Sequence, residues 1–124
     1  MVTMARILAV DDSPAMRQMV SVTLRSGGHD VLEAFDGCDA LNIAKKQPAV
    51  DLVITDINMP NMDGITLVKE LRLLAHYRGV PLLVLTTEAS VQKKQEGKAA
   101  GATGWIVKPF NPERLLETVA RVVG

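Results

Sequence analysis

Three carboxylates and one ammonium group stand at the ends of short apolar runs in this sequence. Asp11 and Asp12 follow the first run, Asp56 follows another, and Lys108 follows the last. Such runs are typical of buried parallel strands, whose carboxyl ends share one edge of a sheet. At about 4 Å and an effective dielectric constant near 20, each carboxylate pair would repel by roughly 4 kcal/mol. We therefore expect a metal ion or the lysine to hold these groups together.

The donor atoms predict which cation would bind. The three aspartates supply only oxygen ligands, without a nearby histidine or cysteine, and this donor set selects a hard cation. Few protein ligands suit Mg²⁺, because it retains several waters. Three carboxylates carry a charge of −3, which Mg²⁺ and Lys108 would balance. Such a site favours phosphoryl transfer, a reaction that depends mainly on positioning and charge neutralisation.

Five short apolar runs alternate with stretches of helical length, and no repeat, low-complexity tract or linker interrupts them. The predicted strands are Arg6 to Val10, Val31 to Ala34, Leu52 to Thr55, Leu82 to Thr86 and Trp105 to Val107. The pattern predicts an α/β fold of the (βα)5 type with right-handed crossovers. The simplest arrangement is a doubly wound parallel five-stranded sheet in the flavodoxin-like order 2-1-3-4-5, which is known for folds of this class.

Capping residues mark several of the predicted helix boundaries. Ser13 before Pro14 predicts the start of the first helix, and Asn111 before Pro112 predicts the start of the last. Asp63 is expected to cap the helix that begins at the next residue. Glycines that follow the first and fourth helices act as stop signals; these are Gly27, Gly28 and Gly101.

Apolar spacing distinguishes the helices from one another. The first helix is expected to bury one face, formed by Met16, Met19, Val20 and Leu24. The segment from Ser90 to Ala100 offers only Val91 and small alanines for packing. It also contains Gly97, which costs about 1 kcal/mol relative to alanine in a helix. We predict that this fourth helix is the least firmly anchored element.

Length and composition limit the kinds of protein that this chain can be. The 124 residues suit one domain, 48% are apolar, and 14 basic residues balance 14 acidic ones. No global field therefore attracts nucleic acid or membrane. The single cysteine, Cys38, excludes an internal disulfide and fits a reducing compartment; we expect it to be a small packing residue. Residues 1–124 are expected to form one cytoplasmic, monomeric domain without an output domain.

Four sequence fragments at successive strand ends together resemble the response-regulator receiver domains of two-component signalling. They are Asp11-Asp12-Ser13, the segment from Asp56 to Gly64, Thr86-Thr87-Glu88, and Lys108-Pro109-Phe110. The resemblance covers nearly the whole chain, in order and at the expected spacing. Among receivers, the chain looks most like the single-domain chemotaxis regulators. The resemblance also favours a cis Lys108–Pro109 bond, although only about 5–6% of bonds before proline are cis in folded proteins.

The resemblance implies a role for each residue of the acidic site. Asp56 would accept a phosphoryl group from a phosphohistidine. Asp12, Asp56 and the backbone carbonyl of Asn58 would bind Mg²⁺, and Asp11 would act largely through a bound water. Lys108 would pair first with Asp56 and then with the phosphoryl oxygens.

A second set of implied roles concerns the switch. The hydroxyl of Thr86 would bind the new phosphoryl group, which adds about −1.5 to −2 charge. The family commonly has an aromatic residue, most familiarly tyrosine, at the position of Trp105. Here the larger indole either packs or takes part in the switch, and the sequence does not decide between these roles. The partner surface would comprise the fourth helix, fifth strand and fifth helix.

The resemblance also implies partners, and it leaves alternatives open. The partners would be a sensor histidine kinase, a flagellar motor switch protein or another protein target, and a phosphatase. A phosphate sink or a phosphorelay receiver would share the whole site. Aspartyl-phosphate hydrolases also use a carboxylate nucleophile with Mg²⁺, but they pair aspartates as Asp-x-Asp, whereas Asp11 and Asp12 are adjacent here.

Overall fold

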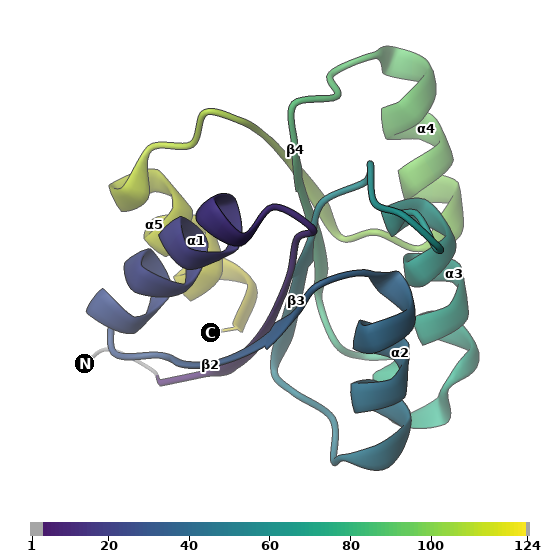
Figure 1. The fold of residues 1–124 in the computed structure, drawn as a ribbon, viewed down its shortest axis with the longest axis horizontal. Coiled ribbons are helices and arrows are strands. Elements are labelled where there is room, and N and C mark those ends of the chain that lie inside the picture. Colours follow the sequence, from purple (N-terminus) through teal and green to yellow (C-terminus); the bar gives the residue numbers. More distant parts are fainter. Residues whose placement is uncertain (1–3, 124) are drawn as a thin grey trace.

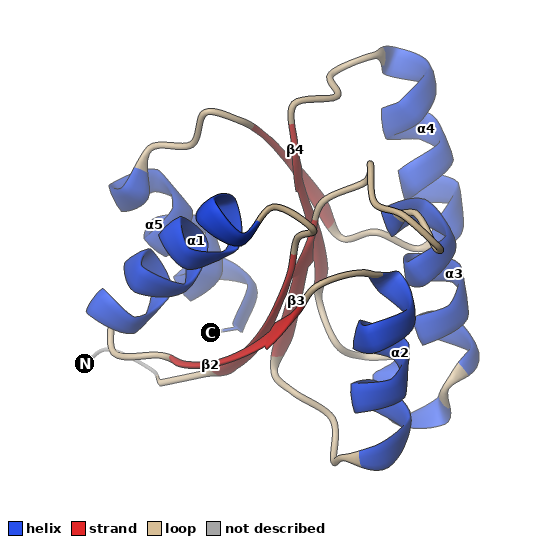
Figure 2. Ribbon diagram, in the orientation of Figure 1, coloured by secondary structure: helices blue, strands red, loops and turns tan. Residues whose placement is uncertain are grey.

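The computed structural model describes residues 4–123, in which five strands alternate with five helices (Figure 2). The strands are β1 (Arg6–Val10), β2 (Asp30–Ala34), β3 (Leu52–Thr55), β4 (Leu82–Thr86) and β5 (Gly104–Val107). The helices are α1 (Pro14–Ser26), α2 (Gly37–Lys46), α3 (Gly64–Leu73), α4 (Val91–Ala100) and α5 (Pro112–Val123). All five predicted strands are confirmed, although β2 and β5 each begin one residue earlier than predicted.

The five strands form one parallel sheet in the order β2-β1-β3-β4-β5. This confirms the predicted doubly wound, flavodoxin-like α/β fold. The strand order reverses direction at β1, so that β1 and β3 flank the switch point of the sheet. In such sheets the carboxyl ends of these two strands border the crevice in which ligands bind.

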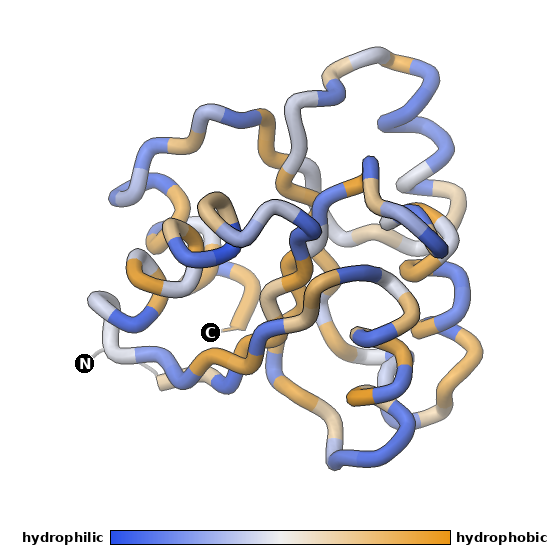
Figure 3. Tube along the Cα trace, in the orientation of Figure 1, coloured by the Kyte–Doolittle hydropathy of each residue, from blue (hydrophilic) through white to orange (hydrophobic). Residues whose placement is uncertain are grey.

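Helices cover both faces of the sheet: α1 and α5 lie together on one side, and α2, α3 and α4 lie on the other (Figure 1). Side chains of β1 alternate accordingly. Leu8 and Val10 join the cluster beneath α2 and α3, whereas Ile7 and Ala9 join the cluster beneath α1 and α5. Burial on both faces explains why the central strands are continuous apolar runs, which are coloured orange in Figure 3.

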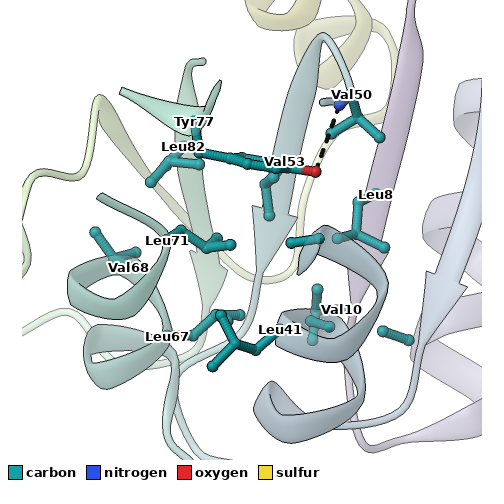
Figure 4. Packing of buried hydrophobic residues seen from close by; sticks show 13 residues of the cluster. Leu8, Val10, Leu41, Val50, Val53, Leu67, Val68, Leu71, Tyr77 and Leu82 are labelled. Atoms are coloured by element: carbon teal, nitrogen blue, oxygen red, sulfur yellow. Dashed lines mark hydrogen bonds between the residues drawn. The ribbon is translucent and has the colours of Figure 1, made fainter. Parts of the chain in front are cut away.

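Tyr77 lies fully buried in the larger core, on a short 3-10 turn (Ala75–Tyr77) that follows α3. Its ring packs among side chains of α3, β3 and β4, and its hydroxyl accepts a hydrogen bond from the amide of Val50 at 3.4 Å (Figure 4). The only polar atom of this large side chain therefore has a partner, as burial requires.

The predicted helix caps are observed. Ser13 accepts a hydrogen bond from the amide of Met16, Asp63 accepts one from Thr66, and Asn111 accepts one from Arg114. The predicted packing of α1 is only partly correct, because Val20 and Leu24 are buried whereas Met19 is 56% exposed.

The fourth helix is anchored as weakly as predicted, since Gly97 is its only buried residue. Val91, its one large apolar residue, is 70% exposed and does not serve as an anchor. The expectation for Cys38 was wrong: it is exposed. It lies at the second position of α2, where the face of the helix points away from the sheet while Ala40, Leu41 and Ala44 are buried.

Within residues 4–123, the longest helices fall short of the length and apolar character needed to cross a membrane.

Candidate functional site

Three charged residues of the site directly follow strands, and their backbone is hydrogen-bonded to the sheet. The amide of Asp11 donates to the carbonyl of Ala34 at 3.2 Å, and the amide of Asp56 donates to Val10 at 3.0 Å. The amide of Lys108 donates to the carbonyl of Thr86 at 2.8 Å. Each bond extends the strand ladder by one residue. The backbone beneath the charged side chains is therefore as fixed as the strands.

The structure brings the three aspartates and the lysine together. Ligand oxygens of Asp11, Asp12 and Asp56 all lie within 4.8 Å of one another. The Nζ atom of Lys108 lies 2.9 Å from Oδ2 of Asp11 and 3.0 Å from Oδ2 of Asp56. The side chains of Lys108 and Asp11 are each 7% exposed, and that of Asp56 is 13% exposed. Lys108 thus bridges two carboxylates, where the sequence predicted a pair with Asp56 alone.

The environment of Lys108 keeps it charged. Burial by itself would lower the pKa of the ammonium group, but the hydrogen bonds and charges of Asp11 and Asp56 outweigh burial and raise the pKa above its ordinary value of 10.5. Lys108 is therefore a permanent cation at neutral pH. The peptide bond between Lys108 and Pro109 is cis, the isomer that the resemblance favoured.

Asp56 is fixed from a second direction by the loop that follows it. Its Oδ1 atom accepts a hydrogen bond from the amide of Ile57 at 2.7 Å. The loop closes where the amide of Gly64 donates to the carbonyl of Ile57 at 2.9 Å. A Cβ atom at Gly64 would overlap the carbonyl oxygen of Asp56, so this close approach requires glycine.

Asp11 is held by groups whose role the sequence did not reveal. Its Oδ1 atom accepts from the amide of Ser13 at 2.9 Å, and its carbonyl accepts from Nη1 of Arg17 at 2.7 Å. The guanidinium of Arg17 also pairs with Glu33 at 3.3 Å. Arg17 lies in the first turn of α1, and its side chain reaches β2. No local sequence pattern would indicate this contact. Arg17 links the backbone of Asp11 to both elements.

Thr86 is fully buried, and its hydroxyl is engaged by the loop between β4 and α4. The Oγ1 atom accepts a hydrogen bond from the amide of Glu88 at 3.2 Å. Within the described part of the chain, the recorded partner of this hydroxyl is therefore the loop and not the acidic cluster. Thr86 stands at the carboxyl end of β4, on the same edge of the sheet as Asp56 and Lys108.

Trp105 contacts the same loop from β5. Its indole Nε1 donates to the carbonyl of Glu88 at 2.9 Å. The ring lies against α4 at Gly97, where a Cβ atom would stand only 2.7 Å from Cζ3 of the indole. Gly97 therefore makes room for the indole. Of the two roles that the sequence left open for Trp105, packing is observed, and the indole is also bonded to the loop that begins at Thr86.

The chemistry of the acidic cluster fits a hard divalent cation. Its three carboxylates supply oxygen ligands from within a small volume, and Asp12 is exposed, so that water can complete the coordination. Asn58, the fourth predicted ligand, is an exposed residue of the loop after Asp56. Lys108 already neutralises part of the charge, which leaves an excess of two negative charges for a metal ion to balance.

Comparison with known proteins identifies the family of the chain. The sequence model of the response regulator receiver domain family matches residues 7–120. The chain belongs to the response regulator receiver family. The acidic cluster is consistent with the phosphoacceptor site of such domains.

The similar proteins include chemotaxis proteins and other receivers. A chemotaxis protein CheY homolog of Campylobacter jejuni is 41% identical over 120 residues, which are 96% of this chain and 92% of that protein. The structure of the chemotaxis protein CheY4 of Vibrio cholerae is 56% identical and superimposes with a TM-score of 0.91, covering 97% of this chain and 99% of that one.

A second similar structure contains a metal ion. The receiver domain of sensor histidine kinase PA1611 of Pseudomonas aeruginosa is 30% identical, with a TM-score of 0.90 over 98% of this chain and 99% of that one. It was crystallised with a magnesium ion coordinated in its active site cleft. Together with the oxygen-rich cluster seen here, this likeness makes Mg²⁺ the cation to test.

Proposed function

We propose that this protein is a phosphorylation-activated signalling switch in which Asp56 accepts a phosphoryl group from a phosphohistidine of a sensor histidine kinase. The observation that carries the proposal is the bridge from Lys108 to Asp11 and Asp56, with Asp12 beside them. A carboxylate oxygen of Asp56 forms the new P–O bond while the P–N bond to the imidazole breaks. The electron pair of the broken bond remains on the imidazole nitrogen.

The charged residues of the site divide the work of this transfer. Asp11, Asp12, Asp56 and the backbone carbonyl of Asn58 would hold Mg²⁺, which when bound supplies neutralisation of charge on the phosphoryl oxygens. Lys108 holds the carboxylate of Asp56 in place and then binds a phosphoryl oxygen. The chain thus assists its own phosphorylation and dephosphorylation without being an enzyme that acts on another substrate.

The readout runs through Thr86 and its loop. A phosphoryl group on Asp56 is a stronger acceptor for the Thr86 hydroxyl than the surroundings it has now, since charge-assisted hydrogen bonds are about twice as strong as neutral ones. Rotation of the hydroxyl towards the phosphoryl group gives up the bond from the amide of Glu88. Because Trp105 is bonded to the carbonyl of Glu88, movement of this residue reaches both β5 and the weakly anchored α4.

The partner surface is formed by α4, β5 and α5. Similarity to CheY proteins of Campylobacter and Vibrio supports a target in chemotaxis, most directly a flagellar motor switch protein, and a phosphatase would reset the switch. Capture of motor switch components with and without beryllofluoride distinguishes this role from a phosphate sink. A sink, or a phosphorelay receiver, would bind beryllofluoride and Mg²⁺ without a gain in affinity for the motor protein.

Labelling by acetyl phosphate with Mg²⁺ tests the acceptor. We expect the labelling to disappear in Asp56→Asn and to remain in Asp63→Asn, which alters a helix cap instead. Full labelling of Asp56→Asn would refute the assignment. Sustained hydrolysis of a phosphomonoester that survives Asp56→Asn but is lost in Asp11→Asn would identify an aspartyl-phosphate hydrolase.

A further inference from the structure

The loop of residues 57–62 reaches from Asp56 to the cap of α3. Its last two residues, Asn61 and Met62, contact the turn before α2 and the first turn of α2. The amide side chain of Asn61 donates from Nδ2 to Oδ2 of Asp36 at 2.8 Å. Asp36 belongs to the turn between β2 and α2, 25 residues earlier in the chain. Asn61 has a backbone φ of 70°, a left-handed conformation that asparagine tolerates better than most residues.

A second contact fixes the same part of the loop. Gly37, the first residue of α2, approaches the backbone of Met62 so closely that a Cβ atom there would lie 2.7 Å from the carbonyl oxygen of Met62. The loop therefore rests directly on the first turn of α2. Two independent contacts, one polar and one steric, join the loop that carries Asn58 to a neighbouring helix.

Asp36 is buried, at 3% exposure, and both of its carboxylate oxygens are used. Oδ1 accepts from the amide of Asp39 at 2.8 Å and so caps α2, while Oδ2 accepts from Asn61. These donors, the Asp39 amide before the Asn61 side chain, lower the pKa of Asp36. Among the ion pairs recorded for residues 4–123, none includes Asp36. Its charge is therefore stabilised by amide donors and by the amino-terminal end of α2.

A cap alone does not require both oxygens. Asparagine caps helices as well as aspartate does, but its side chain has one acceptor oxygen and one NH₂ group. Facing Asn61, an asparagine at position 36 would either place its NH₂ group against that of Asn61 or give up the bond to Asp39. The need for two acceptors thus comes from the loop.

We propose that Asp36 and Asn61 are positioning residues for the metal site, and that their hydrogen bond holds the loop of residues 57–62 so that the carbonyl of Asn58 points at the cation. This inference rests on the proposed function, since it takes the Asn58 carbonyl as a ligand. Groups that orient metal ligands from outside the coordination shell typically alter metal affinity by about 10–100-fold. Within residues 4–123, the hydrogen bonds of the Asp36 and Asn61 side chains go to each other and to the amide of Asp39, and no ion pair joins either residue to the acidic cluster, so the effect acts through the loop.

Direct cation binding tests the proposal without any turnover. The affinity for Mn²⁺, followed by the electron paramagnetic resonance signal of the free ion, and competition by Mg²⁺ are measured for Asp36→Asn, Asn61→Asp and the double exchange. Asp36→Asn should weaken binding by roughly tenfold or more, and Asn61→Asp should also weaken it because two carboxylates would then meet. The double exchange restores one donor facing one acceptor, with the same net charge, and should bring the affinity back to within about threefold of the natural protein.

Asp51→Asn is the matched control. Asp51 also accepts a hydrogen bond from a backbone amide, that of Arg6 at 2.8 Å, but it precedes β3 and therefore lies at the opposite end of the sheet. The Asp51→Asn variant loses the same charge as Asp36→Asn and should bind the cation with the affinity of the natural protein. Circular dichroism identifies any variant that fails to fold, and Asn61→Ala then replaces it, with the same weakening expected.

The outcomes separate the two proposals. Absence of Mn²⁺ binding to the natural protein, or unchanged binding to Asp56→Asn, would refute the proposed function. Binding that depends on Asp56 but is unchanged in Asp36→Asn, or that the double exchange does not restore, would refute the positioning role alone.

Discussion

Replacement of Lys108 by methionine should destabilise the protein strongly, because it leaves the buried carboxylate of Asp11 and the largely buried carboxylate of Asp56 without their cation. At separations of 2.9 and 3.0 Å and an effective dielectric constant near 20, each contact of the ammonium with Asp11 and Asp56 is worth roughly 5–6 kcal/mol before desolvation is subtracted. Removal of one partner of a buried pair typically costs about 3–5 kcal/mol. Water reaches Asp56, whose side chain is 13% exposed, so we expect about 3 kcal/mol.

Urea unfolding at pH 7 without divalent cations measures this loss. With a slope of about 2 kcal/mol per molar urea, the midpoint should fall by roughly 1.5 M. Lys69→Met serves as the control, because Lys69 is exposed on α3, and it should change stability by less than about 0.5 kcal/mol. Addition of Asp56→Asn to Lys108→Met should recover part of the loss, since it removes one of the unpaired charges.

The difference in unfolding free energy between the natural protein and Lys108→Met should depend on pH, and this dependence can refute the reasoning. Because the folded protein raises the pKa of Lys108 above 10.5, the stabilisation is fully present below that pH and is lost as the pH rises through the folded pKa. The difference between the natural protein and Lys108→Met should be constant from pH 7 to about 9.5 and should shrink above about 10.5. One contrary result is that Lys108→Met lowers the unfolding free energy by less than about 1 kcal/mol at pH 7; another is that it does so by the same amount at a pH well above about 10.5 as at pH 7. Either result would show that Lys108 does not hold the carboxylates as described.

Two further predictions concern the attachment of α4. Gly97→Ala should destabilise the protein by about 1–2 kcal/mol, although alanine favours helix, because the new methyl group would overlap Trp105. In a Trp105→Ala background, the same change should instead stabilise the protein by up to about 1 kcal/mol. Urea unfolding that shows equal effects of Gly97→Ala in both backgrounds would contradict the contact. Arg72→Met should cost about 3 kcal/mol, since its guanidinium donates to the carbonyls of Val80 and Gly101 at 2.7 and 2.8 Å. Hydrogen exchange should become faster in the last turn of α4, and an unchanged rate there would argue against this role.

Local patterns were sufficient to predict most of the fold. The apolar runs located all five strands. The signal is strongest in β1, β3 and β4, because central parallel strands are buried on both faces, whereas the edge strands β2 and β5 are only partly buried. Ser13, Asp63 and Asn111 marked helix starts because their side chains accept hydrogen bonds from nearby amides. The exposure of Met19 and Cys38 was not predicted. Helical spacing shows which residues share a face, but the width of the face that the sheet covers depends on how the helix is packed.

The sequence by itself determined that Asp11, Asp12, Asp56 and Lys108 would share one edge of the sheet, because each follows a strand and parallel strands end together. Only the tertiary structure decided that Lys108 bridges Asp11 and Asp56, and that Trp105 occupies the space left by Gly97. The same holds for the bond between Asp36 and Asn61. These contacts join different elements of the fold, most of them far apart in the chain, through single atoms at hydrogen-bonding or van der Waals distance. Such distances depend on how the helices and loops pack against the sheet, and no short-range pattern of residue types encodes that packing.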